Sequence, residues 1–329
     1  VLVGDWDRHE DQWRWFDIAK GKTKHYLGIP RDRDQVFHVT QGLFPKLASR
    51  SYVLPTLRDF DKDISKIKWV LFKTRFVNAY PAFQFAEDEW MQQANEFKEK
   101  ITDDVLEEAI RQLPQSAFDI RHKSLLETLK TRRDRIPAVM ASYYRFIQKI
   151  ADIQTSDKHE FIAITGESDG GLRVKISKIS KSGEIEDELM NKAYDPSLTK
   201  EIRIYMHDGN DSVILNNGTS PIKLRLIGGN ERKHFTVIES KRKTRIYNKD
   251  NGSLYAGNLS RIKKFISNDS LHTVFEPVNL YNVWMPIVVV GHNLDDGFIV
   301  GAGFKYTGQG GFRKTPYTTT QQLLARYAF

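Results

Sequence analysis

A short motif repeats along the middle of this chain and limits what that region can fold into. Gly209-Asn210 recurs as Gly229-Asn230, and each copy follows a short alternating apolar segment, Ile202–Tyr205 or Leu224–Ile227. A third, partial match to these apolar segments occurs at Arg245–Tyr247. Repeats with a period of about twenty residues are typical of proteins in which neighbouring units stack and share one core. The sequence therefore predicts stacked β coils, as in a β-solenoid.

The turns of this repeat also invite comparison with a calcium site. Asp208–Val213 partly resembles the glycine-aspartate nonapeptide of calcium-binding β-rolls. The second copy, Gly229–Arg232, lacks the aspartate and has an arginine nearby. Glycine and asparagine are also the residues that tolerate positive φ in tight turns. We therefore favour a structural role for these turns over bound Ca²⁺.

Before the repeat, the apolar pattern is helical from about residue 57 to residue 152. One helix is expected from Glu87 to Ile101. A second is expected to begin after Thr102, the predicted N-cap, and to end at Pro114. Two further helices are expected, one from Ser124 to Arg135 and one from Pro137 onward.

Past residue 153 the helical pattern gives way to short alternating segments separated by Gly, Asn and Asp. We expect strands at His159–Thr165, Leu172–Ile179, Lys200–Met206, Ser212–Leu215 and Lys223–Ile227. The sequence thus predicts an α+β protein in three parts. These are a mainly helical domain at 1–152, a β-rich connector at 153–277 and a third β region at 278–329.

The third region has the pattern of a membrane β-barrel. Strands are expected at Trp284–His292, Phe298–Thr307 and Tyr317–Phe329, rich in aromatic residues and glycine. Strands of about ten residues that alternate in this way are typical of outer-membrane barrels. Three strands cannot close a barrel, and open edges are not tolerated in lipid. Either the barrel continues beyond Phe329, or these strands form an ordinary soluble meander.

Two acidic stretches stand near the start of the chain. The first, residues 4–12, holds Asp5, Asp7 and Asp11, and the second holds Asp32 and Asp34. Short strands expected on either side would pair and bring Asp7 close to Asp32. Mg²⁺ prefers hard oxygen ligands of this kind. The two stretches therefore predict a candidate metal site.

Composition excludes several classes of function. The chain of 329 residues has no cysteine, which rules out disulfides, zinc-thiolate sites and cysteine nucleophiles. The histidines are scattered without a His-x-x-x-His pair, and neither a phosphate-binding loop nor a nucleophile elbow occurs. The net charge of +8 suits contact with anionic lipid or phosphorylated ligands. No nucleic-acid motif accompanies it, so we expect no nucleic-acid partner.

No apolar run approaches the roughly twenty residues of a transmembrane helix. The sequence shows no signal peptide and no initiator methionine, and it opens on Val1. We therefore expect a fragment or a processed product.

The acidic stretches resemble two motifs of the atypical kinases of the HipA and spore-coat CotH types. The catalytic loop of these kinases reads roughly Asn-x-Asp-Arg-His-x-x-Asn, and their metal site reads roughly Pro-x-Asp-x-Asp. The matching segments here are residues 5–12 and 30–34. Two positions differ, because Asp5 and Gln12 stand where the kinases have asparagine. The resemblance covers about residues 1–150.

This resemblance implies a metal-dependent phosphotransferase in which an aspartate orients the attacking hydroxyl and another holds magnesium. It leaves both ATP binding and activity open, because no nucleotide-binding lobe precedes the motifs in this chain. A degenerate, structural kinase-like lobe is the alternative. The implied site residues are Asp7 and His9 as catalytic groups, Gln12 and Asp32 as Mg²⁺ ligands, and Asp34 as an accessory ligand.

The chain as a whole resembles the surface-antigen (BamA-like) outer-membrane barrel proteins of Gram-negative bacteria. The residues that carry this resemblance are Asp295-Asp296-Gly297, Gly311–Tyr317 and the closing Tyr327-Ala328-Phe329. Some members of this group carry an N-terminal calcineurin-like phosphoesterase domain. The Gly4–Arg8 segment is one residue too short for the motif of that domain, so we do not assign it here.

The resemblance implies an outer-membrane protein with residues 1–277 in the periplasm and a role in envelope biogenesis or transport. Outer-membrane lipid and envelope proteins would be its partners. Two rival hypotheses remain. One is an enzyme proper, a phosphotransferase that uses Asp7 and Asp32. The other is a soluble β-rich binding module whose last strands pack on a core.

Overall fold

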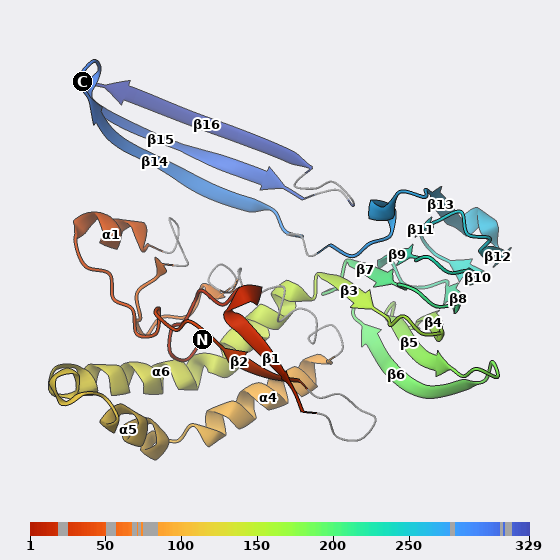
Figure 1. The fold of residues 1–329 in the computed structure, drawn as a ribbon, viewed down its shortest axis with the longest axis horizontal. Coiled ribbons are helices and arrows are strands. Elements are labelled where there is room, and N and C mark those ends of the chain that lie inside the picture. The colour runs from red at the N-terminus through yellow and green to blue at the C-terminus, as the bar shows by residue number, and fades with distance from the viewer. Residues whose placement is uncertain are drawn as a thin grey trace. The chain divides into compact units, whose positions relative to one another are not determined.

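The structure is a computed structural model that describes residues 1–18, 26–50, 57–67, 71, 74, 85–276, 280–309, 312 and 318–329. The chain divides into two compact units. The first comprises Val1–Thr74, Lys98–Val139 and Pro277–Phe329, and the second comprises Arg75–Phe97 and Met140–Glu276. The fold is mixed α and β, with a β-solenoid-like region and several smaller elements (Figure 1).

The solenoid lies in the second unit, and its strands form two sheets. One sheet has the order β12-β10-β8-β4-β5-β6, and the other has the order β13-β11-β9-β7-β3. Every neighbouring pair in the five-stranded sheet is parallel. The strands are β3 (Ile150–Gln154), β4 (Glu160–Gly166), β5 (Leu172–Ile179), β6 (Ile185–Tyr194), β7 (Glu201–Tyr205), β8 (Asp211–Asn217), β9 (Lys223–Ile227), β10 (Lys233–Ser240), β11 (Thr244–Asn248), β12 (Leu254–Gly257) and β13 (Ile262–Ile266). Two 3-10 helices, η3 (Leu259–Arg261) and η4 (Ser270–His272), accompany them.

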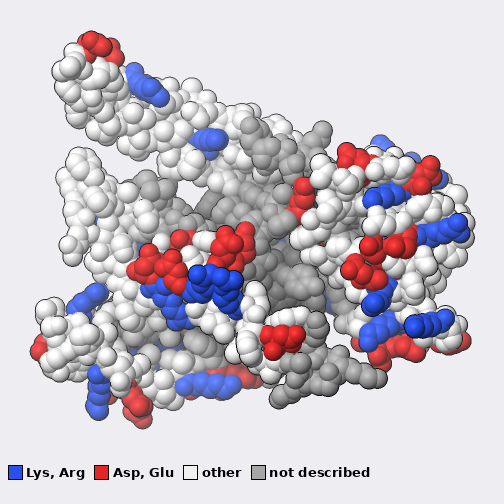
Figure 2. Space-filling view, viewed as in Figure 1, with Lys and Arg blue, Asp and Glu red and all other residues white. Residues whose placement is uncertain are grey.

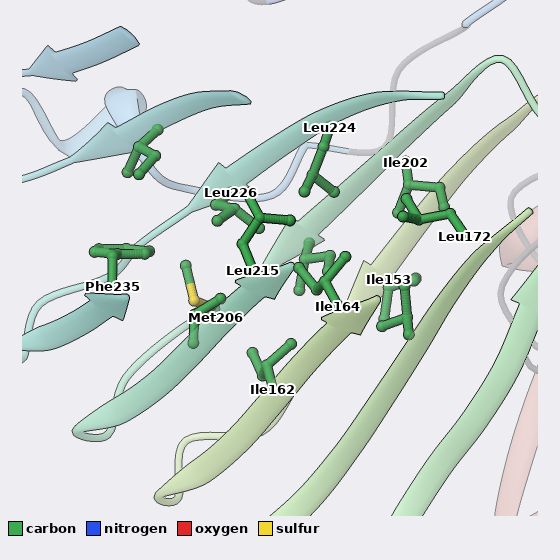
Figure 3. Packing of buried hydrophobic residues seen from close by; sticks show 14 of the residues in the cluster. Ile153, Ile162, Ile164, Leu172, Ile202, Met206, Leu215, Leu224, Leu226 and Phe235 are labelled. Carbon is green, nitrogen blue, oxygen red and sulfur yellow. The ribbon is translucent and has the colours of Figure 1, made fainter. Parts of the chain in front are cut away.

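The core of the solenoid is formed by apolar side chains of both sheets (Figure 3). Ile162 and Leu215 from one sheet and Ile204 from the other are fully buried. Because successive strand residues point to opposite faces, each short strand contributes only two or three such side chains. Burial of an aliphatic side chain of this size stabilises a fold by about 1.5–3 kcal/mol. A single coil therefore cannot be stable alone, and stacking supplies the core.

Close contacts between coils explain the Gly-Asn repeat. A Cβ atom at Gly229 would lie 1.5 Å from the carbonyl oxygen of His207 in the preceding coil. At Gly209, φ is +88° and a Cβ would lie 2.0 Å from the carbonyl oxygen of Lys158. The Asp208 carboxylate accepts a hydrogen bond of 2.7 Å from the side chain of Asn230. The repeat thus marks the places where coils stack, and the prediction of stacked β coils is confirmed.

One hairpin interrupts the regular coils. β5 and β6 pair antiparallel and extend the edge of the six-stranded sheet beyond β4. The expected strand at Leu172–Ile179 is confirmed as β5. The sequence pattern did not predict β6, because Glu186, Asp187 and Glu188 make most of it polar.

The helices that lead directly into the solenoid are α4 (Glu87–Lys100), α5 (Asp103–Arg111) and α6 (Gln115–Ile147). The expected helices after Glu87 and after Thr102 are confirmed. The Thr102 hydroxyl accepts a hydrogen bond of 3.3 Å from the Val105 amide, so Thr102 is the N-cap of α5. Trp90 in α4 donates a hydrogen bond of 3.1 Å to the Met140 carbonyl in α6.

The prediction of two helices on either side of Pro137 was wrong. α6 is one helix of 33 residues that contains Pro137. Proline removes one backbone hydrogen bond and usually kinks or ends a helix. Here Ile136 and Val139 on either side of it and Tyr143 one turn later are buried. Tertiary packing of these side chains offsets the local cost of the proline.

The C-terminal sheet consists of β14 (Val283–Asn293), β15 (Gly297–Gly308) and β16 (Thr319–Ala328), paired antiparallel in that order. This confirms the expected strands from residue 284 to 307. Tyr317, the first residue of the third expected strand, lies outside the described residues, and the strand itself is observed from Thr319 to Ala328. In Figure 2 most of the visible surface of this sheet is uncharged, with acidic side chains at its tip and a few basic side chains along it.

The register of this sheet assigns its side chains to two faces. Trp284 lies opposite Tyr306, Val288 opposite Ala302, and Ala302 opposite Ala325. The face that we call the apolar face holds Trp284, Pro286, Val288, Val290, Phe298, Val300, Ala302, Phe304, Tyr306, Leu323, Ala325 and Tyr327, with His292 and Gln321 at its ends. The opposite face, which we call the mixed face, includes Ile287, Val289, Gly301, Gly303, Lys305, Thr320, Gln322, Leu324 and Arg326.

Within the part of the chain that the structure describes, no helix is both long enough and apolar enough to cross a membrane.

The N-terminal segment is built around a small hairpin. The 3-10 helix η1 (Glu10–Gln12) leads into β1 (Trp13–Asp17), which pairs antiparallel with β2 (Tyr26–Pro30). A short helix, α1 (Leu43–Ala48), follows. Leu2, Val3 and Phe37 pack against a cluster of apolar residues from α5, α6 and the segment before them: Phe60, Leu106, Ile110, Leu125 and Leu129.

Candidate functional site

The two acidic stretches are held together by Arg8. Its guanidinium donates a hydrogen bond of 2.5 Å to the Arg31 carbonyl and another to the Asp32 carbonyl. The Arg8 side chain also lies 3.0 Å from the Asp5 carboxylate. Arg8 is only 7% exposed, so these bonds are shielded from water. Arg8 therefore fixes the first stretch against the backbone of the second.

The hairpin places the same stretches side by side. Trp13 pairs with Pro30, so the chain before β1 and the chain after β2 leave the same end of the hairpin. The Gln12 amide then donates a hydrogen bond of 3.4 Å to the Asp32 carboxylate. Asp32 has a φ of +43°, a conformation that non-glycine residues seldom adopt. The structure thus brings together two of the predicted site residues, Gln12 and Asp32.

The other predicted site residues lie on the same two stretches. Asp7 precedes Arg8 and is half-buried, and Asp34 is exposed. His9 is half-buried, with its Nε2 atom 3.5 Å from the Gln12 amide nitrogen and its Nδ1 atom 3.9 Å from the Asp11 carboxylate. Figure 2 shows acidic and basic side chains gathered over this N-terminal segment.

Among the described residues, no group of three or more His, Asp or Glu side chains is arranged to hold a metal ion. Mg²⁺ in phosphate-handling sites often uses one or two carboxylates and completes its shell with water and phosphate oxygens. Asp32 offers one exposed carboxylate at this edge of the segment, and the Gln12 amide contacts it through its nitrogen, a hydrogen-bond donor.

Asp5 is a positioning residue in this arrangement. It is 7% exposed and faces Arg8 rather than solvent. Burial raises the pKa of the Asp5 carboxyl, and the positive charges of Arg8 and Arg33 oppose that rise. Its contact with Arg8 gives Asp5 the role of holding the residue that joins the two stretches.

Sequence reasoning missed Arg132, which anchors the N-terminal segment to α6. Its guanidinium is fully buried and donates hydrogen bonds of 2.8 Å to the Leu2 carbonyl and 2.7 Å to the Asp61 carbonyl. It also lies over the rings of Trp6 and Phe60, at 5.2 and 4.7 Å from their centres. Burial lowers the pKa of Arg132 to about 10.

A signal for Arg132 was present in the sequence. It follows Leu129 by three residues and precedes Ile136 by four, so it lies on the buried stripe of α6. An arginine on such a stripe needs acceptors for its donors, which predicts contact with backbone carbonyls or carboxylates.

Comparison of the chain with protein-family models, with curated proteins and with solved structures finds no match.

Proposed function

We propose that this chain belongs to an outer-membrane protein in which β14–β16 begin a transmembrane β-barrel. Residues 1–277, with the solenoid and the kinase-like segment, would lie in the periplasm. The observation that supports this proposal is the division of the C-terminal sheet into an apolar face and a mixed face. The resemblance to surface-antigen barrels extends it to a role in envelope biogenesis or transport, with outer-membrane lipid and envelope proteins as partners.

The apolar face has the composition and length that lipid requires. Val288 is 67% exposed, Leu323 63% and Tyr327 65%, which is unusual for large apolar side chains in water. Along β15 the face runs from Phe298 to Tyr306, about 27 Å at the usual rise per strand residue, which corresponds to about 21 Å along the barrel axis at a strand tilt of about 40°. The apolar band of outer-membrane barrels is about 25 Å tall.

Aromatic residues lie at both ends of this face. Trp284 and Tyr306 pair at one end, with ring centres 4.9 Å apart. Phe298 and Tyr327 lie toward the other end. Aromatic residues at both membrane interfaces are characteristic of transmembrane barrels.

The mixed face suits the inside of a barrel. It carries Lys305, Gln322 and Arg326, which would be costly against lipid. Gly301 and Gly303 lie between them, and a Cβ atom at Gly303 would stand 2.0 Å from the Leu323 carbonyl oxygen. The glycines therefore allow close approach of β15 and β16.

A vesicle experiment tests the membrane proposal. Because three strands cannot close a barrel by themselves, the test measures vesicle binding: the full chain, diluted from denaturant in the presence of phosphatidylcholine vesicles, should bind them through its apolar face, float with them in a density gradient and resist extraction by high salt. Apolar burial rather than charge drives this association, so added salt should not reverse it. Recovery of the whole chain in the soluble fraction would instead favour the soluble β-rich binding module.

A second candidate function is a Mg²⁺-dependent phosphotransferase. The contact between Gln12 and Asp32, and the way Arg8 holds the two stretches together, favour it. In this proposal Asp32, with Gln12 and the accessory Asp34, would hold the ion that neutralises phosphate charge. Asp7 would orient the attacking hydroxyl, assisted by His9. ATP is the phosphate donor to test first.

Calorimetry of ATP binding with Mg²⁺ tests this candidate. Asp32→Ala should weaken Mg²⁺-dependent binding at least about tenfold, because it removes the carboxylate that would hold the ion. Asp17→Ala is the matched control, because Asp17 lies at the opposite end of the same hairpin, where it pairs with Tyr26. Equal affinities of the two variants, or no binding by the unsubstituted chain, would contradict the phosphotransferase proposal.

A further inference from the structure

The five-stranded sheet of the solenoid stacks charged side chains in register. Asp152 on β3 lies beside Arg203 on β7, which lies beside Arg225 on β9. Arg225 in turn lies beside Arg245 on β11, and Arg245 lies beside Lys263 on β13. Neighbouring strands are about 4.8 Å apart, so four cations follow one another at close spacing.

Carboxylates neutralise the first half of this row. Glu201 accepts a hydrogen bond of 2.6 Å from Arg203 and one of 2.8 Å from Arg225. Arg225 also donates to the Tyr247 hydroxyl at 2.9 Å and is 6% exposed. Asp152 lies 3.8 Å from Arg203. These contacts hold Arg203 and Arg225 in fixed positions.

In the second half of the row, Arg245 and Lys263 form no ion pair with a carboxylate of the residues that the structure describes. The side chains around it line a hollow of about 250 Å³ that we call the basic groove: Lys223, Leu224, Arg225, Arg242, Lys243, Arg245 and Lys263. Among the described residues, only Arg225 in this set forms an ion pair with a carboxylate. The cations of the β5–β6 hairpin differ, since Lys175 and Lys178 both pair with acids there.

Like charges on directly adjacent strands destabilise a sheet unless something opposes them. A bound anion would relieve the repulsion between Arg245 and its neighbours on β9 and β13. The small volume suits a compact group rather than a drug-sized molecule. Phosphate offers three acceptor oxygens and up to two negative charges, and it accepts paired hydrogen bonds from arginine.

We propose that the basic groove binds phosphate groups, either of a small phosphorylated ligand or of a lipid headgroup. Arg245 lies at its centre, between Arg225 and Lys263. Lys223 and Lys243 add charge from the adjoining ends of β9 and β11. This inference rests on the solenoid alone and does not depend on the membrane proposal or on the phosphotransferase proposal.

The test uses the full chain and two probes. Inorganic pyrophosphate is titrated by calorimetry, and binding to vesicles of phosphatidylcholine is compared with binding to vesicles that also contain phosphatidylglycerol. Arg245→Gln should weaken the phosphate-dependent binding at least about tenfold, and higher salt should weaken it further. Lys178→Gln is the control, because it removes one exposed lysine from the hairpin and so gives the same change in net charge.

The outcomes separate the two sources of phosphate. Pyrophosphate binding that Arg245→Gln removes would support a small phosphorylated ligand. A preference for phosphatidylglycerol vesicles that Arg245→Gln removes would support a lipid headgroup. The inference is overturned if neither probe binds, or if Arg245→Gln and Lys178→Gln have equal effects. Failure of the membrane proposal would show separately, as a loss of binding to pure phosphatidylcholine vesicles.

Discussion

Replacing Lys233 by methionine should lower the free energy of unfolding of the solenoid by about 3–5 kcal/mol, the usual cost of removing one partner from a buried ion pair. The Lys233 amine lies 2.8 Å from the Asp211 carboxylate, and both side chains are fully buried. The same amine also has the carbonyl oxygens of Met206, His207, Asp208 and Gly209 within hydrogen-bond distance, and these acceptors share its three N–H donors. The substitution would leave a buried carboxylate and four carbonyls without this donor.

Hydrogen exchange followed by mass spectrometry measures this loss within the solenoid, on peptides that cover β7 to β10. Lys175→Met is the matched control. Lys175 also lies 2.8 Å from a carboxylate, that of Glu188, but both side chains are nearly half exposed. Exposed pairs of this kind contribute about 0–1 kcal/mol. Similar exchange in the two variants would contradict the assigned role of Lys233.

The loss of unfolding free energy caused by Lys233→Met should be larger at high pH. Burial raises the pKa of Asp211 from 3.8 to about 8, and Lys233 opposes that rise. Without Lys233 the folded-state pKa should be higher still. A raised folded-state pKa means that the folded protein binds the proton more tightly, so stability is lost as pH rises. The difference between the variant and the unsubstituted chain should therefore stay nearly constant from about pH 4 to about pH 8, and it should grow above about pH 8, where Asp211 ionises in the unsubstituted chain but stays protonated in the variant.

The solenoid could be predicted from sequence because the steric requirement for glycine where two coils touch repeats along the chain. Gly229 is required where the backbone of one coil touches the carbonyl of His207 in the previous coil. The same requirement holds at Gly209, twenty residues earlier, so it leaves a period in the sequence. β6 shows no comparable pattern in the sequence. Its pairing with β5 is stabilised by cross-strand contacts such as Lys175 with Glu188, which alternation of apolar residues does not show.

The candidate site could be predicted only in part, for a related reason. The approach of Gln12 to Asp32 follows from two neighbouring strands, which the local pattern indicates. The contacts that hold the segment in place join residues far apart in the chain, as when Arg132 binds the Leu2 carbonyl. When a side chain donates to backbone carbonyls so far away in the sequence, no local motif marks the contact. α6 shows the same limit. Proline usually ends a helix, but packing of the side chains around Pro137 keeps α6 continuous.

Val288→Lys should destabilise the membrane-bound protein by about 2–4 kcal/mol if β14–β16 are part of a closed barrel whose apolar face meets lipid, as charges do near the middle of a bilayer. Val288 lies midway between Trp284 and His292 on β14, which places it near the centre of the proposed membrane span. Val289→Lys is the matched control. It changes the next residue, at the same depth, on the mixed face. There a lysine would point into the barrel interior and should cost much less.

The same pair of variants distinguishes the membrane proposal from a soluble meander, because the two predict opposite orders of stability. In water, Val288 is already 67% exposed, so a lysine there should be nearly neutral. Val289 is less exposed, and in a soluble meander a lysine at this position would be the more disruptive. Urea titration in the presence of vesicles, followed through tryptophan fluorescence, measures the order. Greater stability of Val288→Lys than of Val289→Lys would contradict the barrel and support packing in a soluble protein.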